Sequence, residues 1–195
     1  MKLIPEIVAL NKEHTQWRRD IHVHPELAFD ESRTAEFVAS QLESFGIDVT
    51  CGVGKTGVVG TLKVGSSNKA IGLRADMDAL PMEEINTFAH KSKHPGCMHG
   101  CGHDGHTVML LAAARYLAQS QHFDGTVQFI FQPAEEANAT GSGAKAMIDD
   151  GLFERFLVDN VFALHNGSGF ISGALSTRPG VMTASMDLFL RNPLV

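Results

Sequence analysis

Short, largely apolar runs alternate with helical patterns along the second half of this chain. Three runs of strand length cover residues 70–75, 127–131 and 161–164, and polar residues follow each of them at once. Between these runs, residues 107–118 and 143–150 show the helical repeat of apolar positions. The alternation predicts an α/β fold, in which βαβ units form a mostly parallel sheet with helices on both faces.

The first part of the chain predicts two helices. Residues 4–22 carry apolar positions at helical spacing, and this helix should end before Pro25, because a proline disfavours the helical conformation of the preceding residue. A second helix is predicted from Ser32, as its N-cap, to Phe45. Gly46 would then be the left-handed residue that terminates it.

A glycine-rich stretch at residues 52–57 (GVGKTG) fits the spacing of a dinucleotide-binding motif and contains the Gly-Lys-Thr ending of a phosphate-binding loop. Both motifs need a helix directly after the glycines, because the helix N-terminus faces the phosphates. Residues 58–64 instead have the composition of a strand, and Val49 stands where the phosphate-binding loop requires its first glycine. We therefore interpret 52–57 as a turn rather than a nucleotide site.

The composition is that of an ordinary globular protein. Of the 195 residues, 44% are hydrophobic and 19% are charged, unlike a disordered or fibrous chain. The formal net charge of −6 offers no basic surface to nucleic acid, and no apolar stretch suits a signal peptide or a membrane span. Three cysteines, an odd number, favour free thiols or metal ligands over disulfides. We expect a cytoplasmic protein with neither a nucleic-acid nor a membrane partner.

The most distinctive stretch is residues 99–106 (HGCGHDGH). It holds three histidines, one thiol and one carboxylate, and its glycines allow the sharp turns that bring such side chains to one point. The stretch directly precedes the predicted helix at 107–118, so we expect the helix dipole to lower the pKa of Cys101 and favour the metal-binding thiolate. These residue types are those of a metal site.

Further candidate ligands follow the predicted strands. Parallel strands place their carboxyl ends at one edge of the sheet, where α/β proteins bind ligands. The side chains that should gather there are Asp76, Asp78, Cys101, His103, Glu135, Glu136 and His165. Thiolate, imidazole and carboxylate donors suit zinc, manganese, cobalt or nickel rather than calcium. Of two adjacent glutamates, one can bind metal while the other acts as a general base.

Several stretches resemble, in order, the signatures of the M20 metallopeptidase family, and within it the amidohydrolase branch. They lie at residues 19–27 (RDIHVHPEL), 74–81 (RADMDALP), 99–106, 131–136 (FQPAEE), 163–166 (ALHN) and 178–180 (RPG). That branch includes hippurate hydrolases, N-acyl-amino-acid amidohydrolases, N-acetyldiaminopimelate deacetylases and plant auxin-conjugate hydrolases. The resemblance covers almost the whole chain and is specific for the family, but weak for the substrate.

This resemblance implies a centre of two divalent metal ions. The positions that match the ligands of the family are Cys101, His103, Glu136 and His165. Asp76 stands where related metallopeptidases carry a ligating histidine, and the Cys101/His103 pair would compensate for that change.

The resemblance also implies a reaction, the hydrolysis of an N-acyl amino acid to a carboxylic acid and a free amino acid. Glu135 would be the general base that takes a proton from the attacking water and returns it to the departing amine. Asp78 matches the aspartate that orients a metal ligand in related metallopeptidases. The implied partner is therefore a small N-acyl amino acid.

Members of the family are substantially longer than this chain. After the stretch that resembles residues 183–187, they insert a smaller lid domain, through which they form homo-oligomers, and then supply one further metal-binding histidine. We therefore expect residues 1–187 to be the N-terminal part of a catalytic domain and residues 188–195 to be a truncated tail where the lid domain should begin.

Other interpretations of the sequence remain open. Cys97, Cys101, His103 and His106 have a workable spacing for a closed, four-coordinate zinc site, which would make the chain a non-catalytic zinc-binding module. An inactive, truncated remnant of an enzyme is a second alternative. A serine hydrolase has no support, since no Gly-x-Ser-x-Gly motif occurs.

Overall fold

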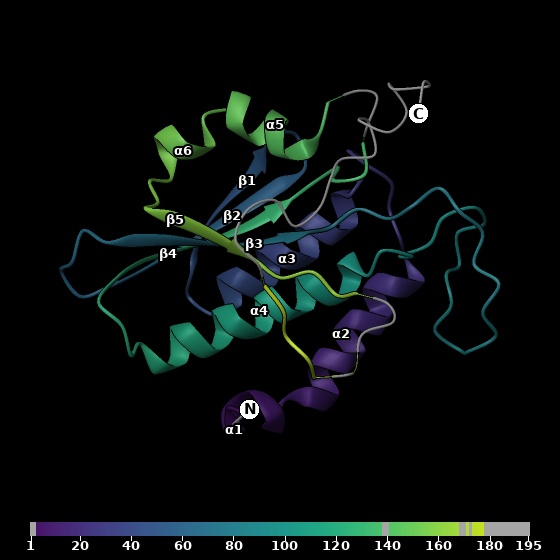
Figure 1. Cartoon of the computed structure of the whole chain (residues 1–195), viewed down its shortest axis with the longest axis horizontal. Helices are drawn as coiled ribbons and strands as arrows, with labels where there is room; N and C mark the ends of the chain where they lie inside the picture. The colour runs from purple at the N-terminus through teal and green to yellow at the C-terminus, as the bar shows by residue number, and fades with distance from the viewer. Residues whose placement is uncertain (1–2, 138–140, 168–170, 172, 178–195) are drawn as a thin grey trace.

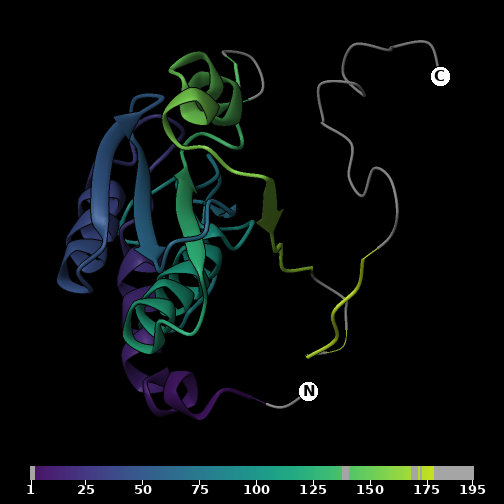
Figure 2. The ribbon, with the colours of Figure 1, turned by 90° about the vertical axis from the view of Figure 1, so that its left-hand side faces the viewer.

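A computed structural model describes residues 3–137, 141–167, 171 and 173–177 of the chain and shows a five-stranded sheet between two layers of helices (Figures 1 and 2). The strands are β1 (Asp48–Val53), β2 (Gly57–Val64), β3 (Ala70–Asp76), β4 (Gly125–Gln132) and β5 (Asn160–Ala163). The helices are α1 (Pro5–Ala9), α2 (Asn11–Val23), α3 (Ser32–Ser44), α4 (His103–Ser120), α5 (Gly143–Asp149) and α6 (Leu152–Arg155). The motif at 178–180 and the predicted tail at 188–195 lie outside the described residues.

The strand order is β1-β2-β4-β3-β5. β3 runs parallel to both β4 and β5, whereas β2 is antiparallel to β1 and β4. Among the described strands, β2 alone therefore opposes the common direction, and the prediction of a mostly parallel α/β sheet is confirmed. The reversal arises because β1 and β2 form a hairpin, with the turn at residues 54–56 inside the predicted glycine-rich turn.

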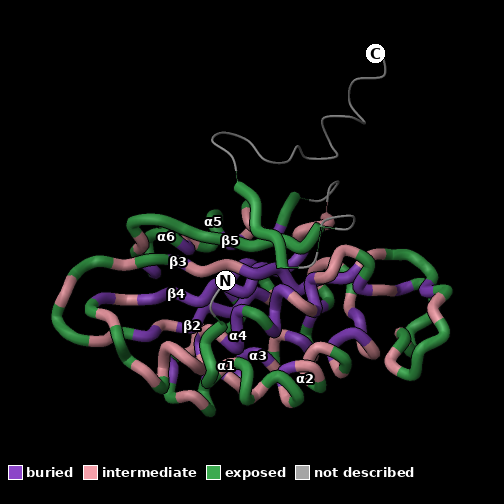
Figure 3. The backbone as a smooth tube through the Cα atoms, turned by 60° about the horizontal axis from the view of Figure 1, so that its bottom comes forward, coloured by how far each residue is buried: buried purple, intermediate pink, exposed green. Residues whose placement is uncertain are grey.

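Helices cover both faces of the sheet, as predicted. α3 and α4 bury one face, where the largest core cluster contains Leu42, Leu111, Phe129 and Phe131. α5 and α6 lie against the other face, where Ile130 packs in a smaller cluster. The burial-coloured tube shows the central strands largely buried and the outer strand β5 exposed (Figure 3).

The N-terminal helices differ in detail from the prediction. The helix expected at 4–22 is divided into α1 and α2, which meet at Leu10. α3 begins one residue earlier than predicted, so that Glu31 rather than Ser32 occupies the N-cap position. Gly46 has a φ of +76°, the left-handed conformation expected of a helix terminator. β1 and α6 were not predicted, because neither has a clear periodic pattern.

The sheet brings the polar loops together at one edge. In the parallel register Asp76 of β3 lies beside Gln132 of β4, so the residues that follow both strands emerge side by side. α4 packs against β3 and delivers its N-terminus to the same edge. No helix in the described part of the chain is long and apolar enough to cross a membrane.

Candidate metal centre

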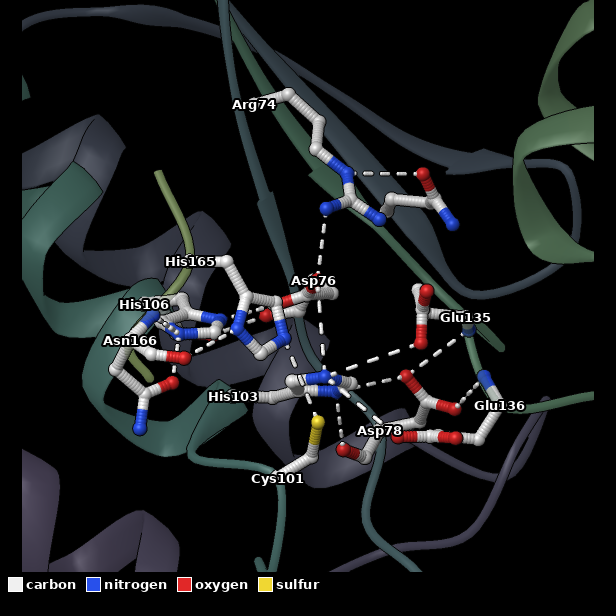
Figure 4. A network of polar contacts seen from close by, with 12 residues as sticks. Arg74, Asp76, Asp78, Cys101, His103, His106, Glu135, Glu136, His165 and Asn166 are labelled. Carbon is white, nitrogen blue, oxygen red and sulfur yellow. Dashed lines mark hydrogen bonds and ion pairs between the residues drawn. The ribbon is translucent and has the colours of Figure 1, made fainter. Parts of the chain in front are cut away.

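Four chain segments converge where the strands end (Figure 4). Asp76 and Asp78 follow β3, Cys101 and His103 lie at the start of α4, Glu135 and Glu136 follow β4, and His165 follows β5. All seven side chains predicted to gather at one edge of the sheet are therefore found there.

His103 lies at the middle of this cluster and is 0% exposed. Its Nδ1 donates to the backbone oxygen of Asp78 at 2.8 Å, with Oδ1 of the same residue at 3.2 Å, which leaves Nε2 as the lone-pair nitrogen. That Nε2 is buried and has no hydrogen-bond partner among the described residues. It faces carboxylate oxygens of Asp76 at 3.7 Å, Glu136 at 3.9 Å and Glu135 at 4.0 Å. A buried lone pair among carboxylates fits a cation.

Cys101 adds a thiol to the same cluster, with its Sγ 3.4 Å from Nε2 of His165. Burial, together with the negative charge of Glu136 and its neighbours, raises the pKa of Cys101 to about 12. The expectation that the helix dipole lowers this pKa is therefore wrong, because burial and the surrounding carboxylates outweigh the dipole. The thiol would become a thiolate only beside a compensating positive charge such as a metal ion.

Asp78 connects His103 to the loop that carries Glu135 and Glu136. Its carboxylate accepts hydrogen bonds from the backbone N–H groups of Glu135 at 3.0 Å and Glu136 at 2.9 Å, in addition to its contact with His103. A single buried side chain thus orients one imidazole and the backbone of the loop that carries both glutamates.

Glu135 and Glu136 differ in their surroundings. The Glu135 side chain is 38% exposed and that of Glu136 is 24% exposed. Burial and the neighbouring charge of Glu136 raise the pKa of Glu135, which makes it a stronger base than an ordinary glutamate.

Two groups of side chains are close enough to hold a metal ion. One comprises Cys101, His103 and Glu136, and the other comprises Asp76, His103, His106 and His165. In each group the ligand atoms lie within 4.8 Å of one another. Because the groups share His103, they form one continuous cluster rather than two separate sites.

Asp76 and His106 are not among the ligands that the family resemblance implies, and they contact one another directly. Nδ1 of His106 lies 2.6 Å from Oδ1 of Asp76, and Arg74 donates to the other carboxylate oxygen at 2.7 Å. Burial opposes ionisation of Asp76, but the hydrogen bond from His106 and the nearby positive charges hold the pKa of Asp76 well below its usual range. Asp76 therefore remains ionised and can bind a cation.

The closed zinc site considered from the sequence is not assembled. The buried thiol of Cys97 donates to the backbone oxygen of Pro25 and belongs to neither metal-capable group of the described residues. Cys101 and His103 share a group, but His106 belongs to the other one. The four side chains therefore do not surround one point.

Asp104 points away from the centre, although it belongs to the same sequence stretch. Its Oδ2 accepts a hydrogen bond from Arg18 Nε at 2.7 Å and lies 2.8 Å from Nδ1 of His22. Nε2 of His22 lies 3.2 Å from Glu84, so His22 pairs with carboxylates rather than with the metal cluster. This buried network joins α2 to the start of α4 and was not predicted.

Together, the fold and the site define an α/β protein with a metal-binding cluster of thiol, imidazole and carboxylate groups at the carboxyl edge of its sheet. The sequence model of peptidase family M20/M25/M40 matches residues 72–193, and the chain belongs to this family.

Among its relatives, hippurate hydrolase of Campylobacter jejuni is 53% identical over 189 residues, which cover 97% of this chain and 48% of that protein. Thermostable carboxypeptidase 2 of Saccharolobus solfataricus is 43% identical and is matched over 97% of this chain and 49% of its own length. The YXEP protein of Bacillus subtilis, described as a dinuclear metal binding peptidase, superposes with a TM-score of 0.75 at 38% identity, covering 82% of this chain and 44% of its own. The chain therefore spans about half the length of the relatives it matches.

Proposed function

We propose that the chain holds two divalent metal ions and hydrolyses the amide bond of N-acyl amino acids, such as hippurate-like or N-acetyl compounds. The proposed ligands are Cys101, His103, Glu136 and His165, and their donor types suit zinc, manganese, cobalt or nickel. The observation that carries this proposal is the buried Nε2 of His103, which lacks a partner among the described residues and faces three carboxylates.

Divalent ions in such a centre supply Lewis acidity, which polarises a scissile carbonyl and lowers the pKa of water. Glu135 would accept the proton of the attacking water on its carboxylate and later deliver it to the leaving amine. Its raised pKa suits both steps, because the carboxyl group can take up and release a proton closer to neutral pH. Asp78 would keep His103 and the backbone of both glutamates in place throughout.

The experiment combines metal analysis with an activity assay. The purified chain would be loaded with zinc, manganese or cobalt, its metal content measured, and hydrolysis followed with N-benzoyl, N-acetyl and indoleacetyl amino acids. Two ions per chain with turnover support the proposal. One tightly held zinc without turnover on any of these substrates would support the zinc-binding module instead.

Glu135→Gln tests the role of the base. Because the amide cannot accept the proton, kcat should fall by about 100- to 10,000-fold while two metal ions remain bound. Glu154→Gln, on the exposed surface of α6, is the matched control and should leave kcat unchanged. Near-normal turnover of Glu135→Gln would remove Glu135 from the mechanism.

A further inference from the structure

Glu31 is a buried carboxylate that takes no part in the proposed reaction. It lies directly before α3 and is 0% exposed. One carboxylate oxygen accepts a hydrogen bond from the backbone N–H of Ala134 at 2.7 Å, and the other accepts one from the hydroxyl of Thr56 in the β1–β2 turn. Burying a carboxylate costs free energy, and an apolar side chain would avoid that cost. The hydrogen bonds of Glu31, which an apolar side chain could not make, therefore need an explanation.

Ala134 has an unusual backbone conformation for a residue with a side chain. Its φ is +48°, in the left-handed region that favours glycine, and it is completely buried directly before Glu135. Its N–H is bound by Glu31, and its carbonyl oxygen accepts a hydrogen bond from the backbone N–H of Gly143 at 2.8 Å. Contacts on both sides therefore hold a conformation that is intrinsically unfavourable.

The direction of the loop after Ala134 depends on this conformation. Three successive backbone N–H groups, those of residues 134–136, donate to buried carboxylates: the first to Glu31 and the next two to Asp78. In this arrangement the side chains of Glu135 and Glu136 both reach toward His103 (Figure 4). A different φ at Ala134 would turn the two glutamates away from the cluster.

We propose that Glu31 is a positioning residue for the Glu135–Glu136 pair, because its carboxylate holds Ala134 in the left-handed turn that presents both glutamates to the metal centre. The inference rests on the proposed function, since it assigns Glu136 as a ligand and Glu135 as the base. Glu31 acts through the backbone and touches neither substrate nor metal.

Substitutions that separate hydrogen bonding from charge test this role. Gln presents an oxygen to Ala134 and an amide N–H to Thr56, so it preserves both contacts without the charge. Asp keeps the charge but is one methylene shorter, and Ala removes the acceptor altogether. A positioning role predicts that Gln preserves the site and that Asp and Ala do not, whereas a role for negative charge alone predicts that Asp preserves it and Gln does not.

The measurement is a titration of the metal-free chain with Co²⁺, followed by the cobalt–thiolate absorption that Cys101 would give. Glu31→Ala and Glu31→Asp should lower Co²⁺ affinity by about 10-fold, and Glu31→Gln should bind like the wild-type chain. If Glu31→Ala does not fold, the comparison of Asp with Gln decides the question.

Glu26→Ala is the control for stability. The Glu26 carboxylate accepts hydrogen bonds from the backbone N–H groups of Arg33 and Thr34 at the start of α3. Among the described residues, it makes no hydrogen bond or ion pair with the loop at 133–136. Its loss should lower the melting temperature without changing Co²⁺ affinity.

The outcomes separate this inference from the proposed function. If Glu31→Ala and Glu31→Asp both bind Co²⁺ with wild-type affinity, the positioning role of Glu31 is overturned but the proposed metal centre is not. Loss of affinity in Glu31→Gln with retention in Glu31→Asp would overturn it as well. A wild-type chain without cobalt–thiolate absorption would overturn the proposed centre and, with it, the role of Glu31.

Discussion

The protonation of Cys101 and His103 is set by their immediate neighbours. Burial and nearby carboxylates raise the pKa of Cys101 to about 12, so the metal-free thiol is protonated at neutral pH. Burial opposes protonation of His103, but the hydrogen bond and charge of Asp78 and the charge of Asp76 raise its pKa overall. A metal ion that binds Cys101 must displace the thiol proton, and the raised pKa of His103 strengthens the competition of protons with a metal ion at this imidazole, so binding and proton release are coupled.

Zinc binding should therefore strengthen with pH and release protons into solution. Both pKa values are raised, so a rise from about pH 6 to about pH 8 lowers the cost of deprotonation and increases apparent affinity. Calorimetry in buffers of different ionisation enthalpy measures the proton count. Cys101→Ser should release about one proton fewer than the wild-type chain. Cys51→Ser, at an exposed position on β1, is the control and should not change the count. Equal release by Cys101→Ser and wild type would exclude the thiol as a ligand.

The loop between β4 and α5 is held by close backbone packing. A Cβ atom on Gly143 would lie 1.7 Å from the backbone oxygen of Pro133, so only glycine fits without movement. The same glycine donates its N–H to Ala134, the residue with a left-handed φ before Glu135. The start of α5 therefore supports the geometry of the candidate base from one side, as Glu31 is inferred to do from the other.

Gly143→Ala should destabilise the chain, because the added methyl group forces Pro133 and the loop apart. We expect the free energy of unfolding to fall by about 2–3 kcal/mol. Gly105→Ala on α4 is the matched control, since its Cβ would meet nothing within 4 Å. It should raise the free energy of unfolding by about 0.5–1 kcal/mol, the usual gain for alanine over glycine in a helix. Urea denaturation of both variants measures these free energies of unfolding. If the two substitutions change the free energy of unfolding by a similar amount, the loop at Gly143 can move to accommodate the added methyl group without cost.

The outer strand β5 distinguishes this molecule from a fully covered α/β domain. All four of its residues are exposed, and within the described part of the chain only β3 pairs with it. Phe162 on β5 is 57% exposed, and Leu164, just beyond the strand, is 63% exposed. A short apolar edge with free backbone groups is a template for pairing with another strand.

Phe162→Lys should reduce self-association of the chain, because a charge on an edge strand opposes strand pairing. The free energy of unfolding should change by no more than about 0.5 kcal/mol, as is usual for an exposed position. Phe153→Lys on α6, where the side chain is 41% exposed, is the matched control. Sedimentation at several concentrations measures the effect. If both variants associate equally, the β5 edge is not the route of association.

Much of the fold and of the candidate site could be predicted from the sequence. The alternation of apolar runs and helical repeats predicted β3, β4, β5, α4 and α5, because each of these segments carries its own run or repeat of apolar residues. The gathering of Cys101, His103, Glu136 and His165 followed from one topological rule, since parallel strands and the helix between them end at a common edge.

The features that could not be predicted from the sequence depend on contacts between residues that are far apart in the chain. Glu31 meets Ala134 across 103 positions and His22 meets Asp104 across 82, and no local pattern records such pairs. The pKa of Cys101 was predicted in the wrong direction, because the helix dipole can be inferred from the sequence, whereas burial and the carboxylates that oppose the dipole come from the packing of other segments. Local side-chain patterns thus specified the elements and the chemical groups, whereas their burial, charge state and mutual support arose only when distant segments packed together.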